Sequence, residues 1–381
     1  MKNKTIMISI VVLSMIAIIL LWQVVSFHPN HKNSNAKDSE IDNSIFHEYY
    51  PQAEKLVNKM TLEEKVGQLF LVRYDSTKVD TYTSLYPGGY ILFAKDFETH
   101  TKESLKNELE ANQMKNPYKL IIGVDEEGGF VTRISRYPNY RTEKYQAPKY
   151  YYELGGYELL KQVETDKAQL LLELGINLNL APVADISMNE EDYMYNRSFG
   201  KDAKETSEFI KNMVTYANDA GINSCLKHFP GYGNNPNTHT GIAIDNRSYE
   251  EFKENDYLPF QAGIEAKVPS ILVSHNIMTC LDDKYPASLS KKVIKDLRDT
   301  LGFTGIIMTD DLEMDAVKAY VENQEAATLA INAGNDMIIT SNFEEMYQEV
   351  LNSIKSGKIK EKTLNKAVLR IIAWKYYSHL L

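Results

Sequence analysis

The sequence has few cysteines, no excess of positive charge and no motif for a nucleotide cofactor. Its two cysteines, Cys225 and Cys280, lack the spacing of metal ligands, so no zinc site is indicated. Both lie in or beside apolar runs, which predicts two small buried side chains. The formal net charge of −10 disfavours nucleic-acid binding, which needs clustered Lys and Arg to neutralise phosphates. No Gly-x-Gly-x-x-Gly or Walker-type loop follows an apolar run, and we expect neither a metal nor an organic cofactor.

The chain also lacks internal repeats and a Ser/Thr-rich stalk, which disfavours a structural adhesin. With 43% hydrophobic and 25% charged residues over 381 positions, its composition is that of a globular protein with a large core. Function therefore has to be inferred from local motifs.

The N-terminal segment is a long apolar run. Lys2 and Lys4 precede Thr5–Phe27, which contains no charged residue and exceeds the ~20 residues needed to span a bilayer. The positive flank should stay in the cytoplasm. A cleaved signal peptide is the alternative, but no small-x-small site directly follows Phe27. We expect residues 1–27 to form an uncleaved single-pass membrane anchor with the rest of the chain extracellular, or secreted if the segment is cleaved.

Residues 28–45 are polar and lack hydrophobic periodicity, which predicts a solvated linker before one folded domain over residues 46–381. In that domain, eight short apolar runs alternate with amphipathic segments. The runs expected to form strands are Gly67–Tyr74, Gly89–Phe93, Leu120–Val124, Ile176–Pro182, Ile222–Lys227, Ser270–Ser274, Gly305–Thr309 and Asp336–Thr340. Such alternation predicts an α/β fold, a closed (β/α)8 barrel of the TIM type, with Leu364–Leu381 as an outer helix.

Polar or charged residues follow these runs at one strand end after another. They are Arg73, Asp125, Asp185, Lys227, His228, Ser274, His275, Asp310 and Asp311. In a barrel the carboxyl ends of the strands converge on one mouth, where the active site lies. Polar turns explain one or two of these residues, but a charged group against an apolar run is costly to bury unless it is paired. The sequence therefore predicts a site at this mouth.

Four motifs occur in order along the chain. They are Asp125-Glu126-Glu127-Gly128-Gly129 with Val131 and Arg133, Asn196-Arg197-Ser198-Phe199-Gly200, Lys227-His228-Phe229-Pro230-Gly231-Tyr232-Gly233, and Met308-Thr309-Asp310-Asp311-Leu312 with Met314. Together they resemble glycoside hydrolase family 3, more narrowly its β-N-acetylhexosaminidase branch. One motif alone would be a weak signal, whereas four in the family's order at predicted strand ends are specific.

The resemblance implies a retaining double displacement, which needs a carboxylate nucleophile and an acid/base group. It places Asp310 as the nucleophile and His239, on a loop after the fifth strand, as the acid/base. The pKa of a His side chain lies near neutral pH, which suits both proton transfers. Asp311 should point away from Asp310, because side chains alternate along extended backbone. The alternatives are a helix N-cap for Asp310 and an exposed bystander for His239.

The sequence departs from the family at Asn237, where the family typically has the Asp that pairs with the catalytic His. A carboxylate would orient the imidazole and stabilise its protonated form, whereas Asn contributes no charge. Three interpretations stay open, namely a tolerant natural variant, a slowed mutant, or a carbohydrate binder with little catalysis.

The remaining matched residues are expected to bind the sugar. Asp125 would accept hydrogen bonds from hydroxyl groups, and donors would come from Arg133, Arg197, Lys227 and His228. The alternative is a salt-bridge network at the barrel mouth, favoured most for Arg133 with Glu127. His275 lies at a strand end, but no role follows from the sequence.

The resemblance implies a β-N-acetylhexosaminidase that releases terminal β-linked N-acetylglucosamine from cell-wall or chitin-like glycans. One alternative is a β-glucosidase or β-xylosidase, but such enzymes usually carry the acid/base elsewhere, which the Asn-Thr-His sequence ending at His239 disfavours. The other is a surface sugar-binding protein that has lost the dyad at Asn237.

Overall fold

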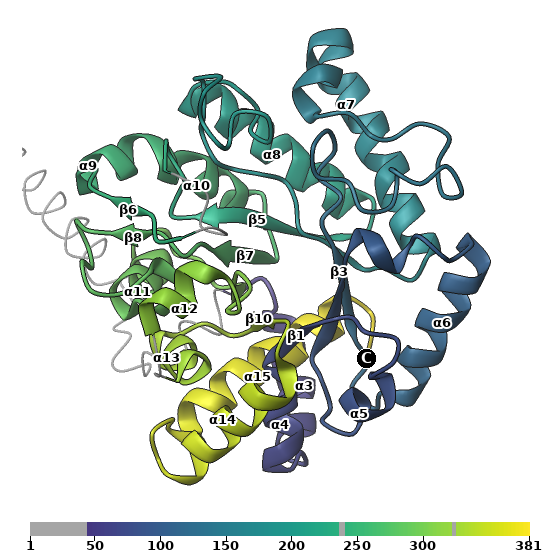
Figure 1. Cartoon of the computed structure of the whole chain (residues 1–381), viewed down its shortest axis with the longest axis vertical. Coiled ribbons are helices and arrows are strands. Elements are labelled where there is room, and N and C mark those ends of the chain that lie inside the picture. Colours follow the sequence, from purple (N-terminus) through teal and green to yellow (C-terminus); the bar gives the residue numbers. More distant parts are fainter. Residues whose placement is uncertain (1–43, 236–240, 322–324) are drawn as a thin grey trace, which may run out of the picture. The chain divides into compact units, whose positions relative to one another are not determined.

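The computed structural model describes residues 44–235, 241–321 and 325–381 (Figure 1). Residues Ser44–Leu381 form one compact unit. The predicted anchor over residues 1–27 and nearly all of the predicted linker over 28–45 lie outside the described residues. Within the described ranges, none of the helices has the length and apolar character required to cross a membrane.

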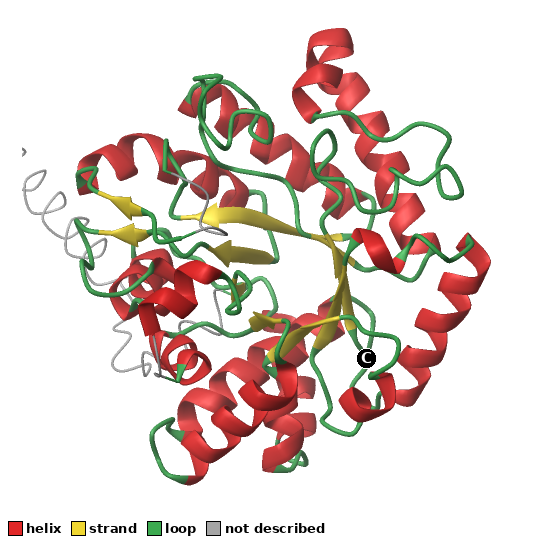
Figure 2. Ribbon diagram, viewed as in Figure 1, coloured by secondary structure: helices red, strands yellow, loops and turns green. Residues whose placement is uncertain are grey.

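Eight parallel strands form the sheet at the centre of this unit (Figure 2). They run in the order β10-β1-β2-β3-β4-β5-β7-β9. Their bounds are β1 Phe70–Arg73, β2 Gly89–Leu92, β3 Ile121–Val124, β4 Leu178–Asn179, β5 Asn223–Phe229, β7 Ser270–Val273, β9 Ile306–Thr309 and β10 Ile338–Thr340. A single parallel bridge between Met308 and Met337 joins the two outer strands, β9 and β10. The sheet is thus a nearly closed barrel, and all eight predicted strands are confirmed.

Helices surround the strands on the outside of the barrel (Figure 2). The described helices of the α class are α3 Tyr50–Val57, α4 Leu62–Gln68, α5 Val79–Thr83, α6 Lys102–Lys115, α7 Pro148–Glu173, α8 Ala203–Asp219, α9 Tyr249–Glu251, α10 Tyr257–Glu265, α11 Lys291–Asp299, α12 Asp315–Val321, α13 Ala326–Ala333, α14 Phe343–Lys355 and α15 Glu361–Tyr377. The predicted C-terminal outer helix is therefore α15, which packs against α3 beside the strands that close the barrel (Figure 1).

Helix α8 illustrates how the sequence sets these elements. The Asp202 carboxylate accepts the Glu205 N–H and caps the first turn, and Gly221, with φ of 79°, follows the helix end. Between them, Phe209 and Met213 lie four residues apart on one face and are buried against the barrel. Strand residues are buried on both faces, because helices cover the outside and side chains fill the inside.

Strand β4 is shorter than its predicted span, and at its end the Asn179 side chain bonds to the backbone of the segment that follows β3. Asn179 Oδ1 accepts the Glu126 N–H at 3.0 Å, and its Nδ2 donates to the Glu126 carbonyl at 3.2 Å. The sequence did not predict β6 Ile244–Asp245 and β8 Ile277–Met278, a separate parallel pair. The cysteine prediction is right for Cys225, which is buried, but wrong for Cys280, which lies in an exposed turn after β8.

Candidate active site

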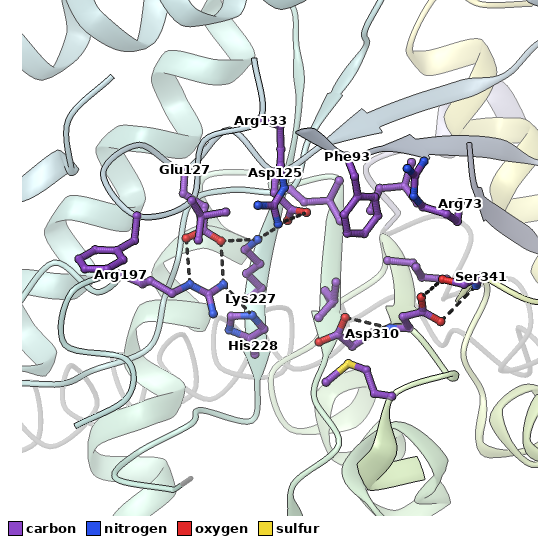
Figure 3. Close-up of a pocket in the computed structure, with 18 of the residues that line it drawn as sticks. Arg73, Phe93, Asp125, Glu127, Arg133, Arg197, Lys227, His228, Asp310 and Ser341 are labelled. Atoms are coloured by element: carbon purple, nitrogen blue, oxygen red, sulfur yellow. Dashed lines mark hydrogen bonds and ion pairs between the residues drawn. The ribbon is translucent and has the colours of Figure 1, made fainter. Parts of the chain in front are cut away.

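A cavity of about 590 Å³ lies at the carboxyl ends of the barrel strands. It is lined by Arg73 from β1, Asp310 directly after β9, Ser341 directly after β10 and residues of the β3 and β5 ends (Figure 3). Six residues predicted to form the site line it together, namely Asp125, Arg133, Arg197, Lys227, His228 and Asp310. We call it the active-site cavity.

Lys227 is the centre of a charged cluster in this cavity. Its Nζ lies 2.6 Å from Asp125 Oδ1 and 2.6 Å from Glu127 Oε1, and its side chain is only 3% exposed. Burial opposes the charge, but the two carboxylates outweigh that effect and raise the pKa of Lys227. Arg133 Nη2 lies 3.7 Å from Asp125 Oδ2 on the other side. Asp125 is thus held between two cations.

Glu127 forms a two-pronged ion pair with Arg197. Arg197 Nε donates to Oε2 at 3.0 Å and Nη2 donates to Oε1 at 2.7 Å. Burial favours the neutral acid, but the charges of Arg197 and Lys227 prevail and hold the pKa of Glu127 well below its usual range. The alternative that pairs Arg133 with Glu127 is therefore wrong in its partners, because Arg133 faces Asp125 and Glu127 faces Arg197.

His228 links this cluster to a buried acid. Its Nδ1 lies 2.7 Å from Asp185 Oδ2, and its Nε2 lies 3.3 Å from Arg197 Nη2. Arginine can only donate, so Nε2 is the acceptor and Nδ1 carries the hydrogen bonded to Asp185. Asp185 Oδ1 also accepts the Tyr232 N–H at 2.8 Å. In this arrangement His228 orients Arg197, which the sequence did not indicate.

Asp310 lies across the cavity from the Lys227 cluster (Figure 3). Its N–H donates to the Val273 carbonyl of β7 at 3.0 Å, and its Oδ1 accepts the Asp311 N–H at 2.8 Å. The next helix, α12, begins only at Asp315, so Asp310 is not the N-cap of that helix. The alternative role of Asp310 as a helix N-cap is thereby excluded for α12.

Asp311 lines the same cavity, but its carboxylate bonds to Ser341, directly after β10. Oδ1 accepts the Ser341 N–H at 3.2 Å, and the Ser341 hydroxyl donates to Oδ2. Burial raises the pKa of Asp311. Behind it, the buried His275 donates from Nε2 to the Asp311 carbonyl at 3.1 Å and contacts Ser288 Oγ through Nδ1 at 2.7 Å. His275 therefore fixes the turn that carries both aspartates.

Sequence reasoning missed two residues that shape the cavity. Glu126 is fully buried, and its carboxylate accepts the N–H groups of Arg133 and Ile134, each at 2.8 Å, which folds the loop after β3 back on itself. Arg73 forms a two-pronged pair with Asp96 at 2.7 and 2.9 Å. The sequence indicated Arg73 only as a polar residue at a strand end. For Glu126, the available signal was the alternation of side-chain direction along extended backbone, which turns it away from the cavity that its neighbours face.

Asn237 and His239 lie outside the described residues, between the described ranges that end at 235 and resume at 241. Within the described ranges, no group of three or more His, Cys, Asp or Glu residues is arranged to hold a metal ion.

Comparison with known proteins places these features in a family. The family model described as "Glycosyl hydrolase family 3 N terminal domain" matches residues 61–374. A "Beta-hexosaminidase" of Hydrogenovibrio crunogenus is 32% identical over 70% of this chain and 75% of its own length. A "Beta-hexosaminidase" of Nitrosomonas eutropha is 31% identical over 73% of this chain and 81% of its own length.

Solved structures agree with the sequence comparison. A glycoside hydrolase family 3 β-N-acetylglucosaminidase from a Paenibacillus species superposes with a TM-score of 0.78 at 27% identity, covering 84% of this chain. The present chain spans 63% of that protein's length. A β-N-acetylhexosaminidase from Beutenbergia cavernae gives a TM-score of 0.74 at 25% identity, and 99% of that chain is covered.

Proposed function

Because the chain belongs to glycoside hydrolase family 3, we propose that it is a β-N-acetylhexosaminidase that releases terminal β-linked N-acetylglucosamine from glycans. The observation that carries the proposal is a single cavity in which the Asp310 carboxylate faces the ion-paired cluster around Lys227 (Figure 3). The relatives named β-hexosaminidases disfavour the β-glucosidase alternative.

The proposed reaction is a double displacement. Asp310 attacks the anomeric carbon while the glycosidic bond breaks, and the leaving oxygen takes a proton from the imidazolium of His239. The neutral His239 then removes a proton from water, whose oxygen attacks the glycosyl-Asp310 ester. The sugar departs with retained configuration, and Asp310 and the protonated His239 are regenerated.

The charged cluster supports recognition of the sugar. Lys227 has three N–H donors, of which two are directed at Asp125 and Glu127, so one is left for a hydroxyl group. Asp125 Oδ2, 3.7 Å from Arg133, has capacity to accept from a second hydroxyl group. Because these groups are already oriented by one another, little reorganisation is needed when the sugar binds.

The second candidate function is a sugar-binding protein with little catalysis, favoured by Asn237 at the position of the usual dyad Asp. Detergent-solubilised full-length protein is incubated with chromogenic β-N-acetylglucosaminide and β-glucoside, beside Asp310→Ala and the exposed control Asp299→Ala. We expect release from the N-acetyl substrate alone, abolished at Asp310 and retained in the control. Silence on both substrates with measurable N-acetylglucosamine binding would establish the binding protein instead.

We also propose that residues 1–27 anchor the protein in the cell membrane with the barrel outside. The support is the uncharged run Thr5–Phe27 behind Lys2 and Lys4. Protease added to intact cells should remove the barrel, which should otherwise stay with washed membranes. A soluble form that begins near residue 30 would contradict the anchor.

A further inference from the structure

Arg247 joins three segments of the chain, namely the loop after β5, strand β6 and the π-helical turn η3 Phe252–Asp256. Its Nε donates to Asp245 Oδ1 at 3.0 Å and its Nη2 donates to Asp245 Oδ2 at 2.8 Å. Nη1 donates to Asp256 Oδ2 at 2.7 Å, and Nη2 also donates to the Gly231 carbonyl at 3.3 Å. Burial opposes the charge of Arg247, but the two carboxylates outweigh that effect and raise its pKa. We call these four residues the Arg247 cluster.

The Arg247 cluster holds the chain on both sides of the segment that carries His239. That segment, residues 236–240, lies outside the described residues, between the loop after β5 and strand β6. On the first side, Asn235 Nδ2 donates to the Tyr232 carbonyl at 2.9 Å and to Asp245 Oδ2 at 2.6 Å. Asp245, in β6, belongs to the other side. The chain that enters the segment is therefore bonded directly to the chain that leaves it.

The backbone of the loop after β5 packs directly against the cluster. A Cβ atom on Gly231 would lie 2.3 Å from Asp256 Oδ1, and one on Gly233 would lie 2.7 Å from Arg247 Cζ. Both glycines also have positive φ, 118° and 53°, which other residues rarely adopt. Asp256 ends η3, and such π-helical turns are rare and frequent at functional sites. Only glycine therefore lets the loop approach Arg247 this closely.

The Arg247 cluster is also connected to the turn that carries the nucleophile. Strand β6 pairs with β8 (Figure 1), and the Ile277 N–H donates to the Ala243 carbonyl at 2.8 Å. Two residues before Ile277 in the chain, His275 donates to the Asp311 carbonyl at 3.1 Å. The bonds through β6, β8 and His275 thus link the described ends of the segment to the turn at Asp310.

We propose that Arg247 is a positioning residue for proton transfer by His239. The inference rests on the proposed function and adds a residue that holds the chain on both sides of the acid/base. Arg247 is not among the described residues that line the active-site cavity, so it acts through Asp245 and Gly231 rather than on the sugar. An acid/base group must lie within hydrogen-bond reach of its proton, and a misplacement of about 1 Å can cost ~100-fold in rate.

The test compares two substrates that differ in their need for a proton. In phenyl β-N-acetylglucosaminide the leaving oxygen takes a proton from His239 as Asp310 attacks, whereas 2,4-dinitrophenolate leaves without one. Detergent-solubilised full-length protein with Arg247→Gln should lose about 100-fold in kcat/KM on the phenyl substrate and less than about threefold on the dinitrophenyl substrate. Its kcat on the dinitrophenyl substrate should still fall, because His239 must remove a proton from water in the second step.

The ratio of the two kcat/KM values is the readout, because a partial loss of folding lowers both together and leaves the ratio unaffected. Arg247→Lys keeps the charge but not the paired N–H groups, so its ratio should be intermediate. The control Lys253→Gln, whose exposed side chain in η3 pairs with Glu250, makes the same change in net charge and should leave both rates unchanged. An equal loss on both substrates in Arg247→Gln, or no loss on either, would overturn the proposal. Unmodified protein that cleaves neither substrate would instead overturn the proposed function.

Discussion

Two buried lysines lie at opposite ends of the barrel in opposite surroundings. Lys227, near the carboxyl end of β5, contacts two carboxylates, which raise its pKa. Lys375, on α15, reaches the amino ends of the strands, where its Nζ donates to Gln68 Oε1 at 2.6 Å and the Lys119 carbonyl at 2.7 Å. Both partners are neutral, and burial lowers the pKa of Lys375 to about 7. Lys227 at the mouth thus keeps its charge, whereas burial at the opposite end favours the neutral form of Lys375.

The largest expected effect is the difference in kcat/KM between variants of the two lysines. Lys227→Met leaves Asp125 and Glu127 without their shared cation, and breaking such a buried pair costs roughly 3–5 kcal/mol of stability. It also removes an oriented donor, which should lower kcat/KM by about 100-fold or more. Lys375→Met should leave kcat/KM within a factor of about two, since it contacts no cavity residue. Equal losses of activity in the two variants would break the comparison.

Removing one acid at the mouth should have a smaller effect. Asp125→Ala leaves Lys227 paired with Glu127 but removes the group expected to accept sugar hydroxyls. Hydrogen bonds to charged groups contribute about 1.5–3 kcal/mol, so kcat/KM should fall by about ten- to 100-fold. KM should rise and kcat should fall together. A nearly unchanged rate would remove Asp125 from the sugar site.

Lys375 should make stability depend on pH. Its pKa is about 7 in the folded state and near its usual 10.5 when unfolded, so between these values the unfolded state binds more protons. The free energy of unfolding should therefore rise by about 2 kcal/mol from pH 7 to 9 through this group, at 1.36 kcal/mol per unit. Denaturant unfolding of Lys375→Met should lack this rise, whereas the exposed control Lys362→Met should retain it. Parallel curves for all three proteins would contradict the lowered pKa.

The smallest expected effect comes from restoring the negative charge that the family typically has at position 237. Asn237→Asp should stabilise the protonated form of His239 and raise kcat about tenfold, the equivalent of one pKa unit. Asn234→Asp adds the same charge to the same loop and should change kcat little. The alkaline limb of the pH–rate profile, where His239 loses its proton, should shift to higher pH only in Asn237→Asp. If both variants behave alike, the proposed dyad is wrong.

The strands were predictable because each is a short apolar run bounded by turn residues, as in Ser270–Val273. The strand ends also identified the mouth, since parallel strands bring residues distant in sequence, such as Asp125 and Asp310, to one cavity. Partners within the cluster were not predictable. The Glu126 carboxylate points into the loop that carries Arg133. The residues on either side of it then have different partners, Arg133 for Asp125 and Arg197 for Glu127. The role of Asp185 depends on the position of His228, which sequence spacing does not encode.

The central claim is that Asp310 forms the covalent intermediate. A fluorinated N-acetylglucosaminyl fluoride, which forms a glycosyl-enzyme that hydrolyses slowly, is added to the full-length protein, and its peptides are analysed by mass spectrometry. The account predicts one added sugar on the peptide that contains Asp310, with fragment ions assigning it to Asp310 and none in Asp310→Ala. A sugar attached to Asp311 or another residue, or cleavage with inverted configuration and no labelled peptide, would contradict it.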